Sequence, residues 1–228
     1  MTLKLVTTTT NLSIIVQIVT TLAGILGLFK KISPQHQILQ QILGLETFVQ
    51  IVELTFYIVF IRGSPLANMA EVRYFDWFIT TPTMLVTSAI YYKYEAYKYQ
   101  QRGETFTLGD FLQKHQKILG VIVLLNALML LFGYLGEKQS ISKLSSGLGG
   151  FVFFFYCFYL LYTHFAKYSP IGNNLFFIMF AIWNLYGVAF FLNPVWKNIA
   201  FNGLDIVAKN FFGVYLFYKI TQVNSIGL

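Results

Sequence analysis

Charged residues are scarce in this chain: they make up 11% of its 228 residues, whereas soluble globular domains carry about a quarter. Cysteine is scarcer still, and the single Cys157 excludes a disulfide framework and a cysteine-based metal site. The three histidines are too scattered to predict a histidine metal cluster. Apolar residues, by contrast, account for 56% of the chain, and the mean hydropathy is +0.62. The composition therefore predicts an integral, multi-pass membrane protein.

The apolar residues are grouped in seven stretches, each close to the roughly 20 residues that a membrane-spanning helix requires. The stretches cover residues 8–29, 38–61, 74–92, 118–135, 144–165, 174–192 and 199–220. The connections are short except for residues 93–117, and none is long enough for a soluble domain. We therefore expect an all-α fold, a seven-transmembrane helix bundle that forms a single domain over residues 1–228 and holds any function inside it.

Basic residues in the connections predict the orientation, because cytoplasmic loops are enriched in Lys and Arg. With the N-terminus outside, nine bases lie on the cytoplasmic side: Lys30, Lys31, Lys93, Lys98, Arg102, Lys114, Lys117, Lys167 and Lys219. Five lie outside: Lys4, Arg62, Lys138, Lys143 and Lys197. This ratio predicts an external N-terminus and a cytoplasmic C-terminus. The bases stand singly and form no patch, so no nucleic-acid partner is expected.

Some ionisable residues fall within predicted spans or at their mouths, where a central charge costs about 2.5 to 3.5 kcal/mol. They are Glu46, Glu53, Arg73, Asp76, Asp205 and Lys209. Asp205 and Lys209 are four residues apart and share one helix face, and Arg73, Asp76 and Thr80 share another. A buried lysine either loses its proton or forms a Schiff base whose charge needs carboxylates. Structural ion pairs that only fasten helices are the alternative interpretation.

Two short runs carry a resemblance to a known family. The third-helix signature of the microbial (type 1) rhodopsins is similar to the run Arg73-Tyr74-Phe75-Asp76-Trp77-Phe78-Ile79-Thr80-Thr81-Pro82, and their seventh-helix signature to the run Leu204-Asp205-Ile206-Val207-Ala208-Lys209. The resemblance extends over all seven helices. It implies all-trans retinal, bound covalently as a protonated Schiff base on Lys209, with Asp76 and Asp205 as counter-ions or proton acceptors and Arg73 beneath them.

The resemblance also implies a retinal pocket built by the third, fourth and sixth helices. Its residues are Trp77, Thr80, Thr81, Asn126, Met129, Trp183, Tyr186 and Phe190. Asn126 matches the position that hydrogen-bonds to the third-helix threonine, here Thr81. Aromatic and Met residues at helical spacing usually form core packing, so the two signature runs carry most of the weight. Two sixth-helix positions depart from the family: Gly187 replaces a proline and Phe190 a tryptophan, which leaves the colour and the light-driven helix movement unpredicted.

Two relay positions of a bacteriorhodopsin-like outward proton pump lack their acids. The cytoplasmic proton donor of such a pump lies three turns after Asp76, where this chain has Thr87. A threonine cannot donate a proton at physiological pH. The extracellular release glutamates are also missing, because residues 193–202 contain Lys197 and no acid. Both features disfavour a pump.

The predicted second helix carries polar residues that pumps generally lack. Glu46, Gln50 and Glu53 share one face and form a wettable stripe of the kind that selects cations. A second-helix glutamate together with Asn210, directly after the retinal lysine, resembles the central gate of the channelrhodopsins. The alternative is that Glu46 and Glu53 are protonated and only bridge helices.

The third member of that gate is a first-helix serine, and the candidate here is Ser13, with Gln17 one turn further along. The short loops and the second-helix glutamates resemble most closely the viral branch of the rhodopsins, in particular the group whose members are light-gated cation channels. We therefore expect a passive pathway through which monovalent cations and protons cross the lipid bilayer.

Other functions remain as alternatives at this point. A light-driven outward proton pump is the first, and a sensory photoreceptor that acts through a membrane partner is the second. An enzyme is not expected, because the sequence has no nucleophile and base pair, no phosphate-binding loop and no metal constellation. A homo-oligomer is compatible with the fold.

Overall fold

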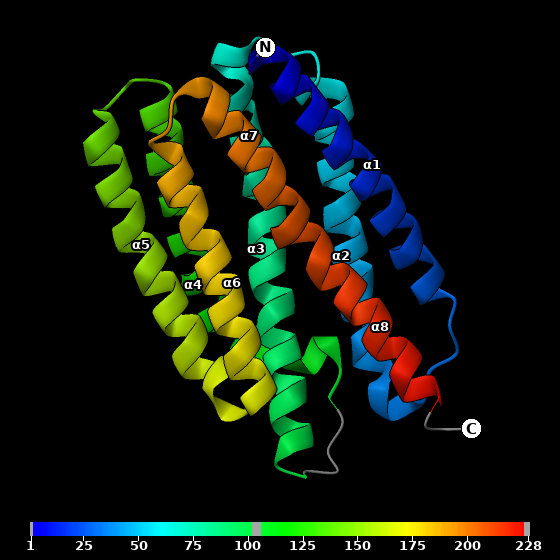
Figure 1. The fold of residues 1–228 in the computed structure, drawn as a ribbon. Coiled ribbons are helices and arrows are strands. Elements are labelled where there is room, and N and C mark those ends of the chain that lie inside the picture. The colour runs from blue at the N-terminus through cyan, green and yellow to red at the C-terminus, as the bar shows by residue number, and fades with distance from the viewer. Residues whose placement is uncertain (1, 102–105, 226–228) are drawn as a thin grey trace.

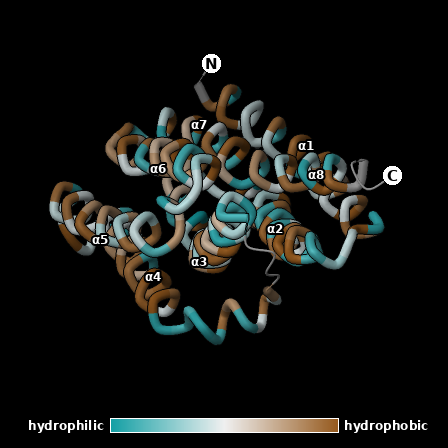
Figure 2. Tube along the Cα trace, turned by 90° about the horizontal axis from the view of Figure 1, so that it is seen from below, coloured by the Kyte–Doolittle hydropathy of each residue, from teal (hydrophilic) through white to brown (hydrophobic). Residues whose placement is uncertain are grey.

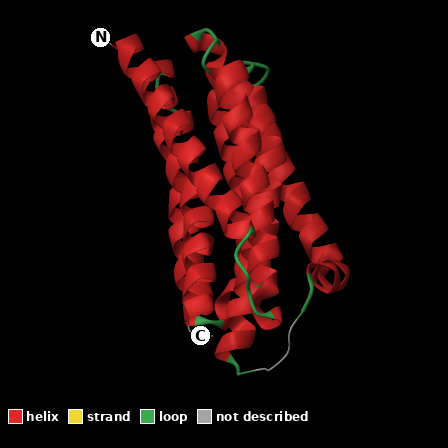
Figure 3. Cartoon of the chain, turned by 90° about the vertical axis from the view of Figure 1, so that its right-hand side faces the viewer, coloured by secondary structure: helices red, strands yellow, loops and turns green. Residues whose placement is uncertain are grey.

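The computed structural model describes residues 2–101 and 106–225 and forms a bundle of long helices packed side by side (Figure 1). Six spans begin with the helices α1 (Thr2–Leu28), α2 (Gln37–Phe56), α3 (Leu66–Tyr99), α4 (Leu108–Glu137), α5 (Lys143–His164) and α6 (Pro170–Phe190). The seventh consists of α7 (Pro194–Asp205), the π turn η4 (Ile206–Asn210) and α8 (Phe211–Ser225) in succession. The described residues contain no strand (Figure 3), which confirms the predicted seven-helix all-α bundle.

Shorter turns continue or precede two of these helices. The π turn η2 (Tyr57–Ile61) extends α2, and the 3-10 turns η1 (Pro34–His36) and η3 (Ala166–Tyr168) precede α2 and α6. Five helical segments of the described chain are long and apolar enough by themselves to cross a membrane, over residues 3–28, 34–61, 108–137, 143–168 and 170–190. The other two spans are α3, which carries Arg73 and Asp76, and the seventh, which its π turn divides.

Short polar side chains begin several helices by satisfying backbone N–H groups that lack an intrahelical partner. Ser142, Ser169 and Asn193 each accept a hydrogen bond from the backbone N–H three residues further along. Pro170 and Pro194 follow two of these caps at the first helical position, where the missing N–H of proline has no cost. The caps stabilise the first turns of α5, α6 and α7 and so fix where these helices begin.

The connection expected over residues 93–117 is shorter than predicted, because both flanking helices extend beyond their apolar stretches. α3 continues to Tyr99, and α4 begins at Leu108. At the start of α4, the Thr107 hydroxyl accepts from the Asp110 backbone N–H at 3.1 Å, and the Asp110 carboxylate accepts from the Thr107 backbone N–H at 3.3 Å. This capping box stabilises a polar first turn that hydropathy alone does not predict. Arg102, assigned to this connection, lies outside the described residues.

Many large apolar side chains lie on the outside of the bundle and several charged ones lie inside it, which is the opposite of the distribution in a soluble protein. Leu148 and Val152 on α5 are 60% and 66% exposed, whereas Arg73, Asp76 and Asp205 have no exposed surface. Figure 2 looks along the bundle and shows hydrophobic residues over α4 and α5. The outside of such a bundle faces lipid, and the polar groups inside must satisfy one another. The protein is therefore an integral, multi-pass membrane protein.

The helices are arranged so that α3 lies at the centre of the bundle, in contact with α2, α4, α6 and α7. On one side, α1 packs against α2, α7 and α8. The two ends of the chain lie at opposite ends of the bundle (Figure 1), as an odd number of spans requires. The functional side chains predicted on the second, third and seventh spans therefore face a common interior.

Candidate functional site

The ammonium group of Lys209 lies among three carboxyl groups in the middle of the bundle. Its Nζ atom is 2.5 Å from Asp76 Oδ2, 3.7 Å from Asp205 Oδ1 and 3.8 Å from Glu53 Oε1. The three acids have no exposed surface, and Lys209 is 2% exposed. The cluster joins the second, third and seventh spans and contains residues that the sequence predicted separately as counter-ions and as part of the gate.

A second cation, Arg73, forms an ion pair with the Asp205 carboxylate. Arg73 Nη1 is 2.9 Å from Asp205 Oδ2 and donates to the Tyr57 hydroxyl at 2.6 Å. Tyr57 in turn donates to Asp205 Oδ2 at 2.7 Å, and Tyr186 donates to Oδ1 at 2.9 Å. Asn202 accepts a hydrogen bond from Arg73 Nη2. Asp205 is therefore the most extensively hydrogen-bonded acid of the cluster.

The charges of this cluster do not balance without a further proton or ligand. Three carboxyl groups face two cations, and all five groups are buried, where an unpaired charge is costly. Neither carboxyl oxygen of Glu53 has a hydrogen-bond partner among the described residues, and its nearest cation is 3.8 Å away. Glu53 is thus the group of the cluster that is left to gain a proton, a water molecule or a cation.

Both π turns of the bundle lie at this cluster. Lys209 and Asn210 belong to η4, and Tyr57 begins η2. A π turn inserts one residue into a helix and frequently marks a functional site. The expected i, i+4 relationship of Asp205 and Lys209 persists across the start of the turn, because their charged atoms remain 3.7 Å apart. The residue after Lys209 is rotated relative to a regular helix, and Asn210 donates weakly, at 3.4 Å, to the Asp205 carbonyl oxygen.

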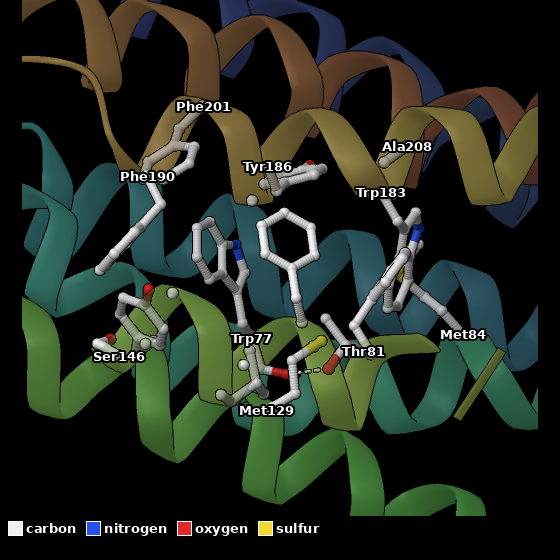
Figure 4. Close-up of a pocket in the computed structure, with 18 of the residues that line it drawn as sticks. Trp77, Thr81, Met84, Met129, Ser146, Trp183, Tyr186, Phe190, Phe201 and Ala208 are labelled. Atoms are coloured by element: carbon white, nitrogen blue, oxygen red, sulfur yellow. Dashed lines mark hydrogen bonds between the residues drawn. The ribbon is translucent and has the colours of Figure 1, made fainter. Parts of the chain in front are cut away.

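A long, mostly apolar cavity extends from Lys209 between α3, α4, α5 and α6. Its walls are mainly apolar and aromatic side chains, and part of it is open to the outside. In Figure 4, Ala208 and Trp183 lie at one end and Phe190 and Ser146 at the other, with Trp77, Met129 and Tyr186 between them. Binding cavities for small molecules are typically lined by apolar and aromatic groups with a few polar ones. The lining fits an extended apolar molecule attached at Lys209.

Most of the residues predicted to line a retinal pocket border this cavity. They are Trp77, Thr81, Met129, Trp183, Tyr186 and Phe190. Asn126 and Thr80 are not among its lining residues. Asn126 donates to the Thr81 hydroxyl at 2.7 Å, which is the contact that the resemblance implies, and Thr80 donates to the Asp76 carbonyl oxygen at 3.0 Å.

Sequence reasoning missed several members of the site. Tyr74, Phe154 and Phe201 line the cavity, as do the glycines Gly133, Gly147 and Gly150. Glycines and phenylalanines are common throughout the chain, so nothing local distinguishes these positions. The positions of Tyr57 and Asn202 could be found from helical spacing. Tyr57 lies four residues after Glu53, and Asn202 lies three residues before Asp205.

Ser13, Glu53 and Asn210, the three residues that resemble a channelrhodopsin gate, are each buried, but they are not hydrogen-bonded to one another in the described part of the chain. Gln17 donates to Ser13 at 2.9 Å, one turn apart on α1. The Asn210 side-chain oxygen accepts from the Thr20 hydroxyl. Glu53 is without such a partner. Thr20, which lies next to Thr21 on α1, is the partner of Asn210 that the sequence did not indicate.

The Glu46 carboxyl group lies beside the position of a pump's cytoplasmic proton donor. That position is occupied by Thr87, and the sequence predicted that no acid stands there. In the structure, Thr87 donates a hydrogen bond to Glu46 Oε1, and both residues have no exposed surface. An acid therefore occupies the depth of the donor position, but it comes from α2 instead of α3. Residues 41 positions apart in sequence give no local sign of this contact.

Comparisons with known proteins agree with this geometry. The family model described as "Bacteriorhodopsin-like protein" matches residues 8–223. No curated protein matches the chain. Among solved structures, the viral rhodopsin OLPVRII is 26% identical and superposes with a TM-score of 0.81, covering 96% of this chain and 99% of that chain.

Two more distant structures share the fold alone. Xanthorhodopsin, described as a light-driven ion pump with dual chromophore, is 18% identical, has a TM-score of 0.74, and covers 100% of this chain and 97% of its own. The light-driven proton pump LR (Mac) from Leptosphaeria maculans is 13% identical, has a TM-score of 0.69, and covers 96% of each chain. With a family model that spans nearly its whole length, the chain belongs to the bacteriorhodopsin-like family of microbial rhodopsins, and it resembles the viral branch.

Proposed function

We propose that this protein is a light-gated cation channel that carries all-trans retinal as a protonated Schiff base on Lys209. Membership of the rhodopsin family implies a retinal chromophore. The cavity supports the attachment site, because Lys209 is the only lysine among its lining residues and its other walls are mainly aromatic and apolar. Asp76, Arg73 and Asp205 then serve as the charged groups that stabilise the positive end of the chromophore.

The observation that carries the channel proposal is the position of Glu53. Its carboxyl group is 3.8 Å from Lys209 Nζ and has no hydrogen-bond partner among the described residues. It also belongs to a column of buried polar side chains between α1, α2 and the seventh span, which includes Gln17, Gln50 and Asn210. Glu53 thus lies both beside the charge on Lys209 and among the buried polar side chains between α1, α2 and the seventh span.

The bound chromophore supplies a light-driven change in shape and in proton affinity next to Lys209. Asp76, at 2.5 Å, is the nearest acceptor for a proton from that nitrogen. Loss of the positive charge at Lys209 removes the attraction that holds Glu53 in place. Glu53 and Asn210 are then free to rearrange, and cations pass along the acidic face of α2 between α1 and the seventh span.

The direction of the light-evoked current, measured at different voltages and ion gradients, tests this proposal. We expect cells that express the chain and receive all-trans retinal to show a light-evoked current under voltage clamp. The current should reverse its direction when the membrane voltage or the sodium and potassium gradients are inverted. The substitution Lys209→Ala should abolish both the visible absorption band and the current. A light-evoked current that stays outward at every voltage and is insensitive to sodium and potassium excludes a channel.

A second candidate function, outward proton pumping, is favoured by one specific contact. The Glu46 carboxyl group accepts from Thr87 and so occupies the region from which a pump reprotonates its chromophore. For pumping, Asp76 accepts the proton and Glu46 returns one from the predicted cytoplasmic side. The same recording separates the two functions, because a pump current keeps its direction. Acidification of the medium around illuminated cells, abolished by a protonophore, is the corresponding readout.

A further inference from the structure

Gln50 is a buried amide whose polar atoms are left without partners. It lies on α2, one turn from Glu46 on one side and one turn from Glu53 on the other. Its side chain is 1% exposed, and neither its Nε2 nor its Oε1 atom has a hydrogen-bond partner among the described residues. An amide can donate two hydrogen bonds and accept two, so leaving all of them unmade is costly. An apolar side chain of the same volume would pack here at a lower cost.

The Gln50 amide fits into a gap that two glycines leave between α1 and α8. A Cβ atom added at Gly213 on α8 would lie 2.3 Å from Gln50 Nε2. A Cβ atom added at Gly24 on α1 would lie 3.5 Å from Gln50 Oε1 and 2.5 Å from Thr47 Oγ1. With a larger residue at Gly213, α8 could not approach the amide this closely, and a larger residue at Gly24 would clash with Thr47 beside it. The three helices therefore meet at the amide group.

Further unpartnered polar atoms belong to this region of the bundle. Among the described residues they include Gln17 Oε1 and Thr21 Oγ1 on α1, and Glu46 Oε2 and both carboxyl oxygens of Glu53 on α2. Each is buried, and together with Gln50 they supply oxygen atoms on helices that pack against one another. Carboxyl and amide oxygens are groups that can replace part of the hydration shell of a cation.

We propose that Gln50 is the size-selecting constriction of the cation pathway, and that its amide oxygen replaces a water molecule on each passing monovalent cation. This inference rests on the proposed channel function. The amide closes the gap between Gly24 and Gly213, and an ion that moves between Glu53 and Glu46 passes it. The width of the gap is set by the backbones of α1 and α8 and by the length of the Gln50 side chain.

The substitution Gln50→Ala tests the proposal, because it removes the amide and widens the gap. We expect the permeability of methylammonium relative to sodium to rise several-fold, measured from the shift in reversal potential when external sodium is replaced by methylammonium. Gly213→Ala should reduce the sodium current, because the added Cβ atom displaces the amide into the pathway. Gly203→Ala, in the same span, is the matched control, because a Cβ atom there meets nothing within 4 Å and should leave the sodium current unchanged.

The failure of this inference can be distinguished from failure of the channel proposal. If the wild-type protein conducts passively but Gln50→Ala keeps the wild-type permeability ratio, Gln50 is not the constriction and the inference is overturned. If the wild-type protein shows no passive current, the channel function fails and the inference fails with it. The visible absorption band reports folding of each variant. Should Gln50→Ala lose the band, Gln50→Asn shortens the amide by one methylene, and we expect a smaller increase in the same ratio.

Discussion

Thr87 donates a hydrogen bond to Glu46 across the interface of α2 and α3, and both side chains are fully buried. The second carboxyl oxygen of Glu46 has no partner among the described residues. Glu46 is therefore held by one contact and remains able to exchange a proton or bind a cation. The same acid can serve the ion pathway of a channel or the donor site of a pump.

The energetic coupling of Glu46 and Thr87 can be measured with a double-mutant cycle. We expect Glu46→Leu and Thr87→Val, each of which removes one partner of the hydrogen bond, to be non-additive by about 1 kcal/mol, which is typical of a buried hydrogen bond. The readout is the free energy obtained from thermal loss of the visible band. The control pair is Glu46→Leu with Thr83→Val, because the Thr83 hydroxyl donates within its own helix, at 3.1 Å from the Ile79 carbonyl oxygen. Equal coupling in both pairs would contradict the contact.

The colour of the pigment should report the unequal distances of the acids from Lys209. Asp76→Asn removes the carboxylate that is 2.5 Å from Nζ, and Glu53→Gln alters the one at 3.8 Å. A close negative charge stabilises the positive charge at the Schiff base in the ground state. We therefore expect absorption to move to longer wavelength in Asp76→Asn and to move less in Glu53→Gln. A larger shift in Glu53→Gln would assign the role of main counter-ion to Glu53.

The charged centre of the site was predictable from sequence because it depends on local spacing. Ionisable residues are conspicuous in apolar spans, and a helix brings residues three or four apart onto one face. Arg73 and Asp76 on α3, and Asp205 and Lys209 on the seventh span, are related in this way. Their contacts across helices then follow from the few charged groups that the interior contains.

The gate was harder to predict because it depends on how separate helices are rotated and shifted. Ser13 and Asn210 were expected to meet Glu53, but Asn210 bonds to Thr20 and Ser13 bonds to Gln17. Asn210 lies in the π turn η4, which rotates the residues after it by an amount that no sequence pattern reveals.

The ion pair of Lys197 with Glu137 was also missed, and it should matter for stability. Lys197 was assigned to an external loop, but it lies in α7, and its Nζ atom is 2.7 Å and 2.8 Å from the two carboxyl oxygens of Glu137 on α4. The side chains are 7% and 10% exposed. Removing one partner leaves an uncompensated buried charge, so we expect Glu137→Gln to cost about 3 kcal/mol or more in thermal unfolding followed by the visible band.

The matched control for this pair is Glu71→Gln. Glu71 binds Lys138 at 2.6 Å, but Lys138 is 45% exposed and water can replace its partner. We expect Glu71→Gln to leave the unfolding temperature close to that of the wild-type protein. Equal destabilisation by both substitutions would show that burial does not govern the strength of these pairs.

The cavity depends on a close approach at Gly133, which lines it from α4. A Cβ atom at this position would lie 2.4 Å from the Tyr74 hydroxyl oxygen and 2.7 Å from its ring. The Tyr74 ring packs edge-on against Trp77, with ring centroids 5.0 Å apart, so a displaced Tyr74 pushes Trp77 into the cavity. We expect Gly133→Ala to slow the formation of pigment from added all-trans retinal, measured as the growth of the visible band.

Gly120→Ala, on the same helix, separates this steric effect from the general effect of alanine in a helix. A Cβ atom at Gly120 meets nothing within 4 Å. The substitution should leave the rate of pigment formation unchanged and stabilise the helix by about 0.5 to 1 kcal/mol, because glycine loses more backbone entropy on folding. If Gly133→Ala takes up retinal at the wild-type rate and with the wild-type spectrum, the chromophore does not occupy this cavity beside Trp77.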